Sequence, residues 1–433
     1  MIQSIFNFDN INFNGGNISC DGGSILLLSF LKKYNLLSSL DDIPFNDTRR
    51  LPKYSNSDIV TQIVLRNLLG YFNQADQMTL VDDPLLSQCI NACSQPTLSR
   101  FFDRINMKTN MTIKEHIQRL GCDYVNRHVE NIILDVDSTK TQTHGHQEAS
   151  AYIYHYGVNG YHPMMINEYN TKLLLSSNFR TGVAYSSNGF INELKEVLAH
   201  LDRKGKTVSM RGDSAFYNTE FMDYMHHEDI QYYIRAKSYE KIQNMIIEHL
   251  EDNGIDYLNY TNQEPYYGEI EYSPKSLSTP CRYVFKVFPA QDKQLTMFPV
   301  IYCIITNDMK RSCEDICDFY EERGNSENFT KELKDDFDGD NVGHHDFEKN
   351  CFQFMISSLC YNFYHLFRIL VLEGKDQKIR MNTFRNKYQK IAVKVIRHAR
   401  RIILSFSSAY RYKKKFLKYY QKLQNQNIKS IVY

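Results

Sequence analysis

The sequence predicts a mixed α/β protein whose core is interrupted by a β-rich insertion and flanked by helical regions at both ends. Between residues 131 and 237, short runs of β-branched and aromatic residues alternate with segments of helical hydrophobic spacing. Three further alternating β segments follow before residue 310. We therefore divide the chain into a helical N-terminal region, the first part of the core, the insertion, the completion of the core and a basic C-terminal region, at residues 1–130, 131–237, 238–310, 311–374 and 375–433.

The composition is that of a chain able to bury a large core. It has 433 residues, of which 42% are hydrophobic and 13% aromatic. No apolar run reaches the roughly 18 residues that a membrane span needs, and the N-terminus lacks the features of a signal peptide. The 10 cysteines include no CxxC pair, which argues against a zinc ribbon or a disulfide framework. These features lead us to expect a cytoplasmic protein with no membrane partner.

The charge is distributed unevenly along the chain. Residues 377–433 contain 16 Lys and Arg and no Asp or Glu, whereas the preceding residues carry 35 basic and 50 acidic side chains. A basic segment on an acidic body is typical of a protein with a polyanionic partner. Nucleic acid is the simplest such partner.

In the N-terminal region, helical spacing of apolar residues indicates short helices, including one from Ser55 to Gly70. A further helix opens at Ser94, with Pro96 in its first turn. Arg100 lies early in this helix, where a helix-turn-helix protein presents its DNA contacts. We consider Arg100 a candidate DNA-binding residue. The alternative is that this helix is plain scaffold.

Strand and helix patterns alternate through the first part of the core. Strands are expected at 131–139, 151–156, 161–166, 207–213 and 230–236, with helices at 188–203 and 218–227. A tight turn at 157–160 would join the second and third strands as a hairpin. This order predicts a mixed sheet covered by helices.

The insertion and the second part of the core show equally regular patterns. A helix near 241–250 and strands at 267–272, 282–288 and 300–306 form the insertion. Cys313–Phe337 is expected to form one amphipathic helix. On it, Tyr320, Arg323, Glu327 and Lys334 would fall within about 60° of one another. A long aromatic-rich helix at 346–373 would contribute its apolar stripe to the core.

Three carboxylates are placed where they could meet. Asp137 ends the first strand, Asp213 ends the fourth, and Glu327 lies on the helix after the insertion. Carboxylates at the ends of neighbouring strands converge, and a helix packed on the sheet can add a third. Such an oxygen-rich group suits Mg²⁺ or Mn²⁺, and two ions about 4 Å apart can support phosphoryl transfer. Asp135 competes with Asp137 for this role, and each aspartate alone is more typical of a turn or cap.

In combination, these motifs resemble the DDE transposases of bacterial insertion sequences. The group with a Tyr-x2-Arg-x3-Glu-x6-Lys helix is matched by Tyr320, Arg323, Glu327 and Lys334. Its first aspartate lies in an Asp-(Ser/Thr)-Thr strand, matched by Asp137-Ser138-Thr139, which favours Asp137 over Asp135. Its second follows a strand, matched by Arg211-Gly-Asp213-Ser214, and 113 residues then leave room for a β insertion before Glu327. The resemblance covers about residues 50–370.

The resemblance implies a ribonuclease-H-like core and cut-and-paste chemistry with two Mg²⁺ ions, for which Mn²⁺ can substitute. Asp137, Asp213 and Glu327 would be the catalytic metal ligands. Arg323 and Lys334 would clamp phosphates, and Tyr320 would contact the DNA backbone. The implied partners are the element's terminal inverted repeats, target DNA and a second copy of the protein. The implied setting is a bacterial cytoplasm, at the nucleoid when DNA is bound.

Two other functions remain open from the sequence. One is a metal-dependent nuclease on the same core that does not transfer strands. The other is an inactive, transposase-derived DNA-binding protein, although such a relic need not keep all three carboxylates. The motifs therefore favour an active transposase.

Overall fold

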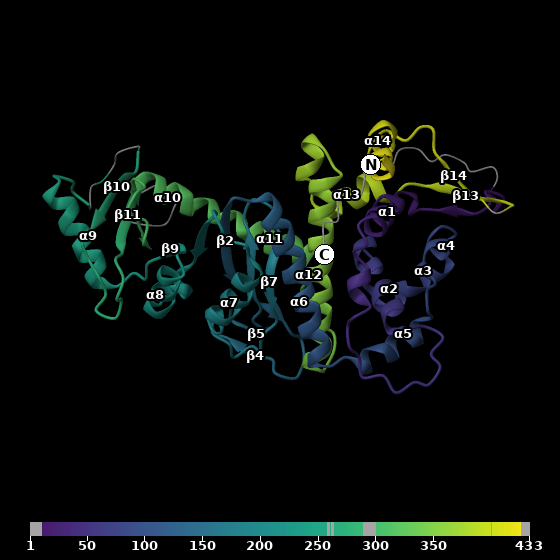
Figure 1. The fold of residues 1–433 in the computed structure, drawn as a ribbon, viewed down its shortest axis with the longest axis horizontal. Helices are drawn as coiled ribbons and strands as arrows, with labels where there is room; N and C mark the ends of the chain where they lie inside the picture. Colours follow the sequence, from purple (N-terminus) through teal and green to yellow (C-terminus); the bar gives the residue numbers. More distant parts are fainter. Residues whose placement is uncertain (1–10, 258–259, 261–263, 289–299, 400, 426–433) are drawn as a thin grey trace. The chain divides into compact units, whose positions relative to one another are not determined.

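The computed structural model describes residues 11–257, 260, 264–288, 300–399 and 401–425 (Figure 1). The chain forms two compact units. One comprises Met1–Arg104 with Phe367–Lys429, and the other comprises Ile105–Leu366 with Ser430–Tyr433. The division differs from the expected one, because the N-terminal and C-terminal regions share a unit and the helix before residue 131 belongs to the other unit.

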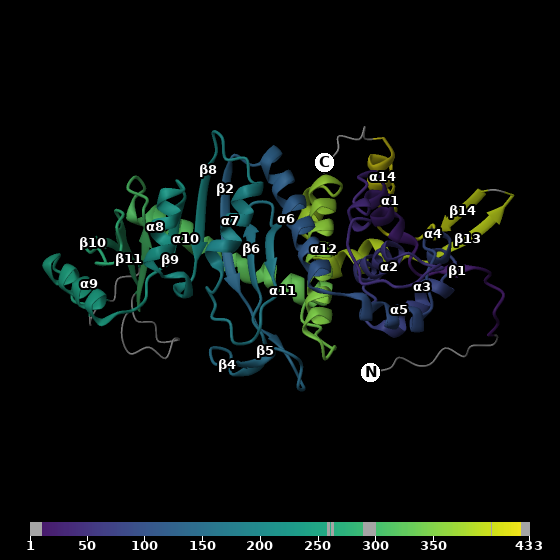
Figure 2. The same ribbon diagram turned by 60° about the horizontal axis from the view of Figure 1, so that its bottom comes forward.

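An eight-stranded mixed sheet organises the Ile105–Leu366 unit (Figures 1 and 2). Its strand order is β10-β11-β12-β9-β8-β2-β6-β7. The strands span β2 Asn131–Ser138, β6 Met164–Glu168, β7 Leu174–Asn178, β8 Thr207–Gly212, β9 Gln231–Arg235, β10 Tyr266–Ile270, β11 Arg282–Phe288 and β12 Val300–Thr306. The three insertion strands thus extend the main sheet, since β12 pairs antiparallel with β9. The expected mixed α/β fold is confirmed at this level.

The register of two central strands sets the positions of the first two candidate carboxylates. Strands β2 and β8 are parallel, with Asp135 opposite Arg211 and Val136 opposite Gly212. Asp137 and Asp213 therefore follow these paired residues at the same edge of the sheet. Because side chains alternate along a strand, a slip of either strand by one residue would turn its aspartate to the other face.

A small second sheet lies between β2 and β6 in the sequence. It has the order β3-β5-β4, with β3 Thr141–Gln142, β4 Ala151–Ile153 and β5 Val158–Tyr161. The expected hairpin exists, but its turn occupies residues 154–157 and not 157–160. The sequence Val-Asn-Gly-Tyr is strand β5, because its backbone pairs with both β3 and β4.

Helices cover the large sheet. Helices α6 and α7 pack against β7, and α10 packs against β9, β10 and β11. The helices of this unit span α6 Met107–His128, α7 Phe190–His200, η5 Ser214–Phe216, α8 Thr219–His227, α9 Glu240–Asp252, α10 Cys313–Glu321, η6 Glu322–Asn325, α11 Ser326–Phe337 and α12 Phe347–Leu370, the last of which contains the boundary between the units. Figures 1 and 2 both show α6 beside α12.

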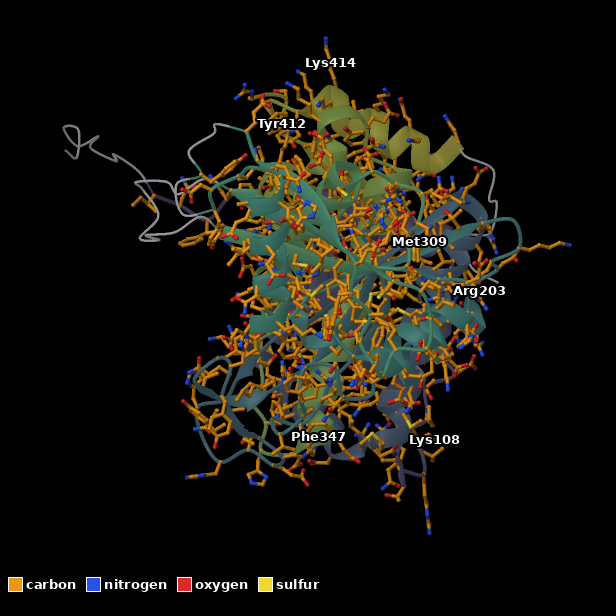
Figure 3. The ribbon with its side chains drawn as sticks, turned by 90° about the vertical axis from the view of Figure 1, so that its left-hand side faces the viewer. Lys108, Arg203, Met309, Phe347, Tyr412 and Lys414 are labelled. Carbon is orange, nitrogen blue, oxygen red and sulfur yellow. The ribbon has the colours of Figure 1, made fainter. Side chains whose placement is uncertain are left out.

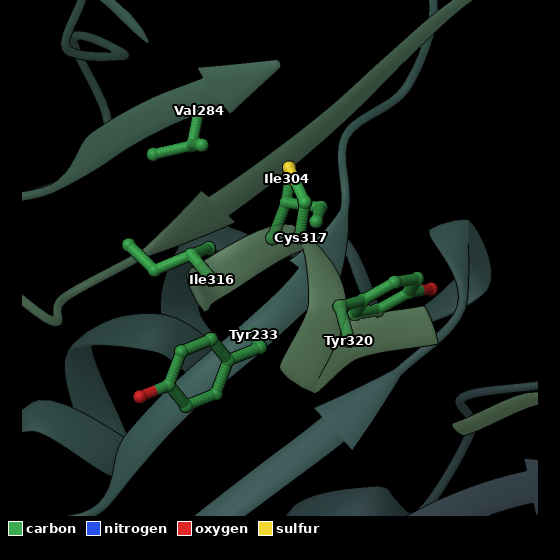
Figure 4. Close-up of a cluster of buried hydrophobic side chains, with 6 residues drawn as sticks. All are labelled: Tyr233, Val284, Ile304, Ile316, Cys317 and Tyr320. Carbon is green, nitrogen blue, oxygen red and sulfur yellow. The ribbon is translucent and has the colours of Figure 1, made fainter. Parts of the chain in front are cut away.

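The expectation of one helix from Cys313 to Phe337 is wrong. The 3₁₀ turn η6 separates α10 from α11, and Gly324 lies within that turn. A 3₁₀ turn has fewer residues per turn than an α-helix, so the expected common face does not continue through it. Tyr320 on α10 packs in a buried cluster with Tyr233, Val284, Ile304, Ile316 and Cys317 (Figure 4).

The other unit combines both ends of the chain. Strand β1 pairs with β13, which pairs with β14. The C-terminal region was expected to be helical, but it also contains these two strands, β13 and β14. Its elements are β1 Ile18–Ser19, η1 Gly22–Ser24, α1 Ile25–Lys33, η2 Ser38–Leu40, α2 Asn56–Leu69, η3 Gln74–Asp76, α3 Gln77–Asp82, α4 Leu86–Cys89, α5 Gln95–Phe101, η4 Phe102–Arg104, η7 Gly374–Lys378, α13 Met381–Phe384, η8 Arg385–Gln389, β13 Val393–His398, β14 Arg401–Phe406 and α14 Lys413–Asn425. Among the helices of the described ranges, none has the length and apolar character needed to cross a bilayer.

Candidate active site

The three candidate carboxylates line one cavity of about 420 Å³ in the Ile105–Leu366 unit. Asp137 comes from β2, Asp213 from the residue after β8, and Glu327 from the start of α11. The remaining lining residues are Ser138, Thr139, His155, Tyr156, Arg323, Thr330, Lys331, Lys334 and Asp335. The fold therefore brings together residues that are up to 190 positions apart between Asp137 and Glu327.

Each aspartate is oriented by a nearby backbone amide. The Ser138 amide donates to Asp137 Oδ1 at 3.0 Å, and the Ala215 amide donates to Asp213 Oδ1 at 2.8 Å. Burial raises the pKa of the Asp137 carboxyl to about 6 despite the nearby Arg323 guanidinium, and the charges of Asp213 and Glu327 add to the increase. Burial and the neighbouring carboxylates thus disfavour the charged form of Asp137.

Arg323 is a largely buried residue of the cavity lining, and its guanidinium lies beside Asp137. Its Nη2 is 3.4 Å from Asp137 Oδ1 and 3.5 Å from the Val136 carbonyl oxygen, both at the long end of hydrogen-bond distance. Burial lowers the pKa of the guanidinium, but Tyr320, Asp137 and Asp213 outweigh this effect and raise it. Its Nε is buried and has no hydrogen-bond partner within the described part of the chain. Arg323 therefore retains donor capacity that the protein does not use.

Glu327 and Lys334 lie on α11, with Lys331 between them. Glu327 is exposed, whereas Lys334 is largely buried. Lys334 Nζ donates to the Lys140 carbonyl oxygen and lies 3.1 Å from Asp340 Oδ1. The ammonium groups of Lys331 and Lys334 and the guanidinium of Arg323 thus give the acidic cavity a cationic wall.

Tyr320 does not line the cavity. Its side chain is only 3% exposed, and its hydroxyl donates to the Gly212 carbonyl oxygen at 3.0 Å. Gly212 directly precedes Asp213. The geometry thus ties α10 to the end of β8 and leaves Tyr320 no exposed surface for a contact with DNA.

Several lining residues were not predicted from the sequence, among them Lys331 and Tyr156. Lys331 follows Glu327 by four positions, a spacing that places it on the same face of α11 and could have revealed it. Tyr156 donates from its hydroxyl to the Ser138 carbonyl oxygen at 3.0 Å, next to Asp137. Burial, together with Asp137 and Asp213, raises the pKa of Tyr156 to about 12. It comes from the β4–β5 turn, which no motif marks as functional.

Arg100 and the basic C-terminal region belong to the other unit. Arg100 is exposed on α5. Part of the basic region's charge is neutralised by ion pairs: Asp376 binds Lys387 and Lys415, and Glu373 binds Lys418 and Lys422. Other cations project outward, such as Lys414 on α14 (Figure 3).

The donor set of the cavity suits a divalent ion. Asp137, Asp213 and Glu327 offer only carboxylate oxygens, the ligands that Mg²⁺ and Mn²⁺ prefer. A divalent cation would also offset the repulsion that raises the Asp137 pKa. Within the described ranges, no three His, Cys, Asp or Glu side chains form a group that could hold a metal ion in this conformation. The ligand type therefore fits, but the ligands are not assembled.

Comparison with known families identifies the class of protein. The model of the family described as transposase DDE domain, group 1, matches residues 10–428, and the chain belongs to this family. It is therefore a transposase of the DDE type, an enzyme class that acts on DNA and generally uses divalent metal ions.

One solved structure similar to this chain is a cryo-EM structure of the piggyBac transposase synaptic complex with hairpin DNA. The TM-score is 0.46 and the sequence identity 12%, over 84% of this chain and 78% of that chain. No curated protein matches the sequence.

Proposed function

We propose that this protein binds the terminal inverted repeats of its own insertion sequence, cleaves the DNA ends and joins the 3′ ends to target DNA. The observation that carries the proposal is the cavity in which Asp137, Asp213 and Glu327 face the cations Arg323, Lys331 and Lys334. Carboxylates beside cations suit a reaction in which metal ions and side chains share the charge of a phosphodiester. Membership of the DDE family supports the same reaction.

In this proposal, Asp137, Asp213 and Glu327 hold two Mg²⁺ ions, for which Mn²⁺ substitutes. The bound metal would supply activation of the attacking oxygen and stabilisation of the leaving 3′ oxygen. Glu327 is exposed at the start of α11, where rotation of its side chain can bring its carboxylate toward the aspartates. We infer that metal binding completes the ligand group.

The cations have separate proposed roles. Arg323 would donate its weakly bonded Nη2 to a phosphate beside the cut. Lys334 would act as a point charge at the other end of the cavity. Tyr320 would act indirectly, by holding the strand end that carries Asp213. These roles agree with a Tyr-x2-Arg-x3-Glu-x6-Lys signature on a ribonuclease-H-like core.

The proposed partners follow from the same reaction. Transposon ends and target DNA are the substrates, and a second copy of the chain would bind the opposite end in the synaptic complex. Arg100 on α5 and the exposed cations of residues 393–414 would contact the end DNA. We place the protein at the nucleoid of a bacterial cytoplasm.

The test uses the full-length protein and a DNA fragment carrying the inverted repeats that flank its reading frame. With Mg²⁺, we expect nicked or excised ends, and joined products when a pre-cleaved end and a target plasmid are supplied. Cleavage without joined products would favour the metal-dependent nuclease. Specific binding without cleavage in Mg²⁺ or Mn²⁺ would favour the inactive DNA-binding protein.

A further inference from the structure

Arg211 and Asp135 form an ion pair that is completely enclosed by the protein. Both side chains have 0% exposure, and neither residue lines the active-site cavity. Arg211 Nε donates to Asp135 Oδ1 at 2.7 Å, and Nη2 donates to Oδ2 at 2.9 Å. This is the two-pronged geometry that a guanidinium offers to a carboxylate and an ammonium does not.

The third nitrogen of the guanidinium contacts a different element. Arg211 Nη1 donates to the Phe319 carbonyl oxygen at 2.6 Å and lies 3.6 Å from Glu322 Oε2. The guanidinium carbon also lies 4.2 Å from the ring centre of Tyr169 and 4.9 Å from that of Phe319. All three guanidinium nitrogens are therefore occupied by protein partners.

These contacts join the two strands that lead to Asp137 and Asp213 and the helix that precedes Glu327. Asp135 lies two residues before Asp137 on β2, and Arg211 lies two residues before Asp213 on β8. Phe319 is near the end of α10, which continues through η6 to Glu327 at the start of α11. A single guanidinium on β8 thus links a side chain of the neighbouring strand β2 to the backbone of the helix segment.

Stability alone is a poor explanation for such a pair. Removing two charges from water costs several kcal/mol, and well-packed apolar side chains often replace a buried ion pair without loss of stability. What an apolar pair lacks is a preferred register, whereas a buried charge strongly disfavours any register in which it is unpaired. The pair is therefore better suited to fixing positions than to adding stability.

We propose that Arg211 and Asp135 are positioning residues that set the spacing of Asp137, Asp213 and Glu327, and with it the affinity for divalent metal. The proposal rests on the proposed function for its catalytic consequence. The effect of the ion pair on metal affinity is measured separately from DNA cleavage. The positioning role and the proposed function can therefore fail independently. Neither residue touches metal or DNA. Both act through the strands and the helix segment that they join.

The main test replaces the pair by apolar residues of similar size in the full-length chain, Asp135→Leu with Arg211→Met. We expect this double variant to unfold at a urea concentration close to that of the wild type and to bind end DNA equally well. Mn²⁺ affinity, measured by titration calorimetry, should fall at least 10-fold. Because a misplacement of about 1 Å costs roughly 100-fold in rate, DNA cleavage should fall by about that factor.

A second variant covers the case in which the double variant does not fold. Arg211→Lys keeps the buried charge pair but replaces the planar guanidinium by a single ammonium nitrogen. The lysine therefore cannot bind Asp135 through two nitrogens and the Phe319 carbonyl through a third. We expect it to fold and to show the same direction of change in Mn²⁺ affinity. The matched control is Arg282→Lys. Arg282 likewise donates to a carboxylate, on Glu269, and to two carbonyl oxygens, but it does not line the cavity.

The outcomes separate the positioning role from the proposed function. Wild-type Mn²⁺ affinity in a folded Arg211→Lys or double variant would overturn the positioning role, as would equal losses in the Arg282→Lys control. Failure of the wild-type protein to bind Mn²⁺ would also overturn it. If the wild type binds Mn²⁺ and the variants do not, but no DNA is cut, the positioning role stands and the proposed function fails.

Discussion

At the scale of single residues, the structure changes the interpretation of the four-residue helix signature. Arg323, Glu327 and Lys334 line the cavity, but Tyr320 is buried behind it and bonded to Gly212. The spacing of the four residues predicted one common face, but only Arg323, Glu327 and Lys334 share it, and Tyr320 precedes the 3₁₀ turn at Glu322–Asn325. The signature therefore combines residues that point into the cavity with one that supports it.

The role of Tyr320 can be tested by Tyr320→Phe. This change removes the hydrogen bond to the Gly212 carbonyl oxygen and leaves that acceptor buried without its partner. We expect a loss of about 1–3 kcal/mol in the free energy of unfolding, measured in urea, with unchanged affinity for end DNA. A drop in DNA affinity without a change in stability would instead show a direct DNA contact.

Asp376 predicts a pH dependence of stability in the other unit. Burial raises the pKa of its carboxyl, but bonds from Lys387, Lys415, Tyr388 and Tyr419 outweigh burial and hold that pKa well below its usual value. A lowered carboxyl pKa stabilises the folded state above the unfolded pKa of about 3.9. That stability is lost as the pH falls toward the folded pKa.

We therefore expect Asp376→Asn to cost about 2–3 kcal/mol of unfolding free energy at pH 7, because a buried charged acceptor is lost. Below about pH 4 the difference from wild type should shrink, since Asp376 then begins to protonate in the unfolded chain, which lowers the stability of the wild type. Urea unfolding followed by circular dichroism between pH 3 and 7 measures both. Glu373→Gln, at a more exposed ion pair, is the control. A pH-independent difference would contradict the proposed role of the carboxylate charge.

At the scale of elements, the contact between α6 and β7 is unusually close. A Cβ added to Gly121 would lie 2.6 Å from the Leu174 carbonyl oxygen and 2.8 Å from Leu175 Cδ2. We expect Gly121→Ala to destabilise this unit by roughly 1–3 kcal/mol through overpacking, as measured by thermal or urea unfolding. Gly324→Ala is the control, because nothing lies within 4 Å of its added Cβ. Equal stability of both variants would show that α6 can move away from β7.

Element positions were predictable where local pattern and tertiary context agree. The expected strands 282–288 and 300–306 match β11 and β12 because alternating apolar residues face a buried sheet. Strand β7 was missed because its Ser176 and Ser177 look like loop residues. Both are buried, and their hydroxyls bond to Glu193 and Ser358, partners that no local pattern reveals. Strands β13 and β14 were missed because their basic residues suggested only charge.

The residues of the candidate site were likewise predictable only where the local sequence pattern determines their position. Asp137, Asp213 and Glu327 could be named because each lies at a position set by its own element, and the sequence order of the elements predicts a shared edge. The strand pattern alone could not decide between Asp135 and Asp137, since both share one face of β2, and only the resemblance of Asp137-Ser138-Thr139 favoured Asp137. The structure shows Asp135 buried against Arg211, and only Asp137 lines the cavity.

At the scale of the whole molecule, the described part of the basic C-terminal region, residues 375–399 and 401–425, belongs to a folded unit. Deleting residues 377–433 would remove β13, the partner of β1, and so would test folding as well as DNA binding. Neutralising exposed cations leaves these strands in place and therefore tests DNA binding without removing part of the fold. We choose Lys394, Arg397, Arg401 and Lys414, all exposed on β13, β14 or α14.

We expect replacement of these four residues by Gln to weaken binding to end DNA and to flatten its salt dependence. The slope of log K against log salt should decrease by about 0.9 for each DNA phosphate that the variant no longer neutralises. Fluorescence anisotropy between roughly 50 and 200 mM salt measures it. Lys418→Gln with Lys422→Gln serves as the control, because these cations already pair with Glu373. An unchanged slope would remove this surface from the DNA interface.

The central claim is that the cavity is a metal-dependent active site that cuts DNA. The most direct test compares the wild type with Glu327→Gln on DNA carrying the flanking inverted repeats, scoring binding and cleavage in the same samples. We expect Glu327→Gln to bind the ends with wild-type affinity and to show no cleavage in Mg²⁺, because the change removes a proposed metal ligand without altering shape. Cleavage by this variant at the wild-type rate would contradict the claim.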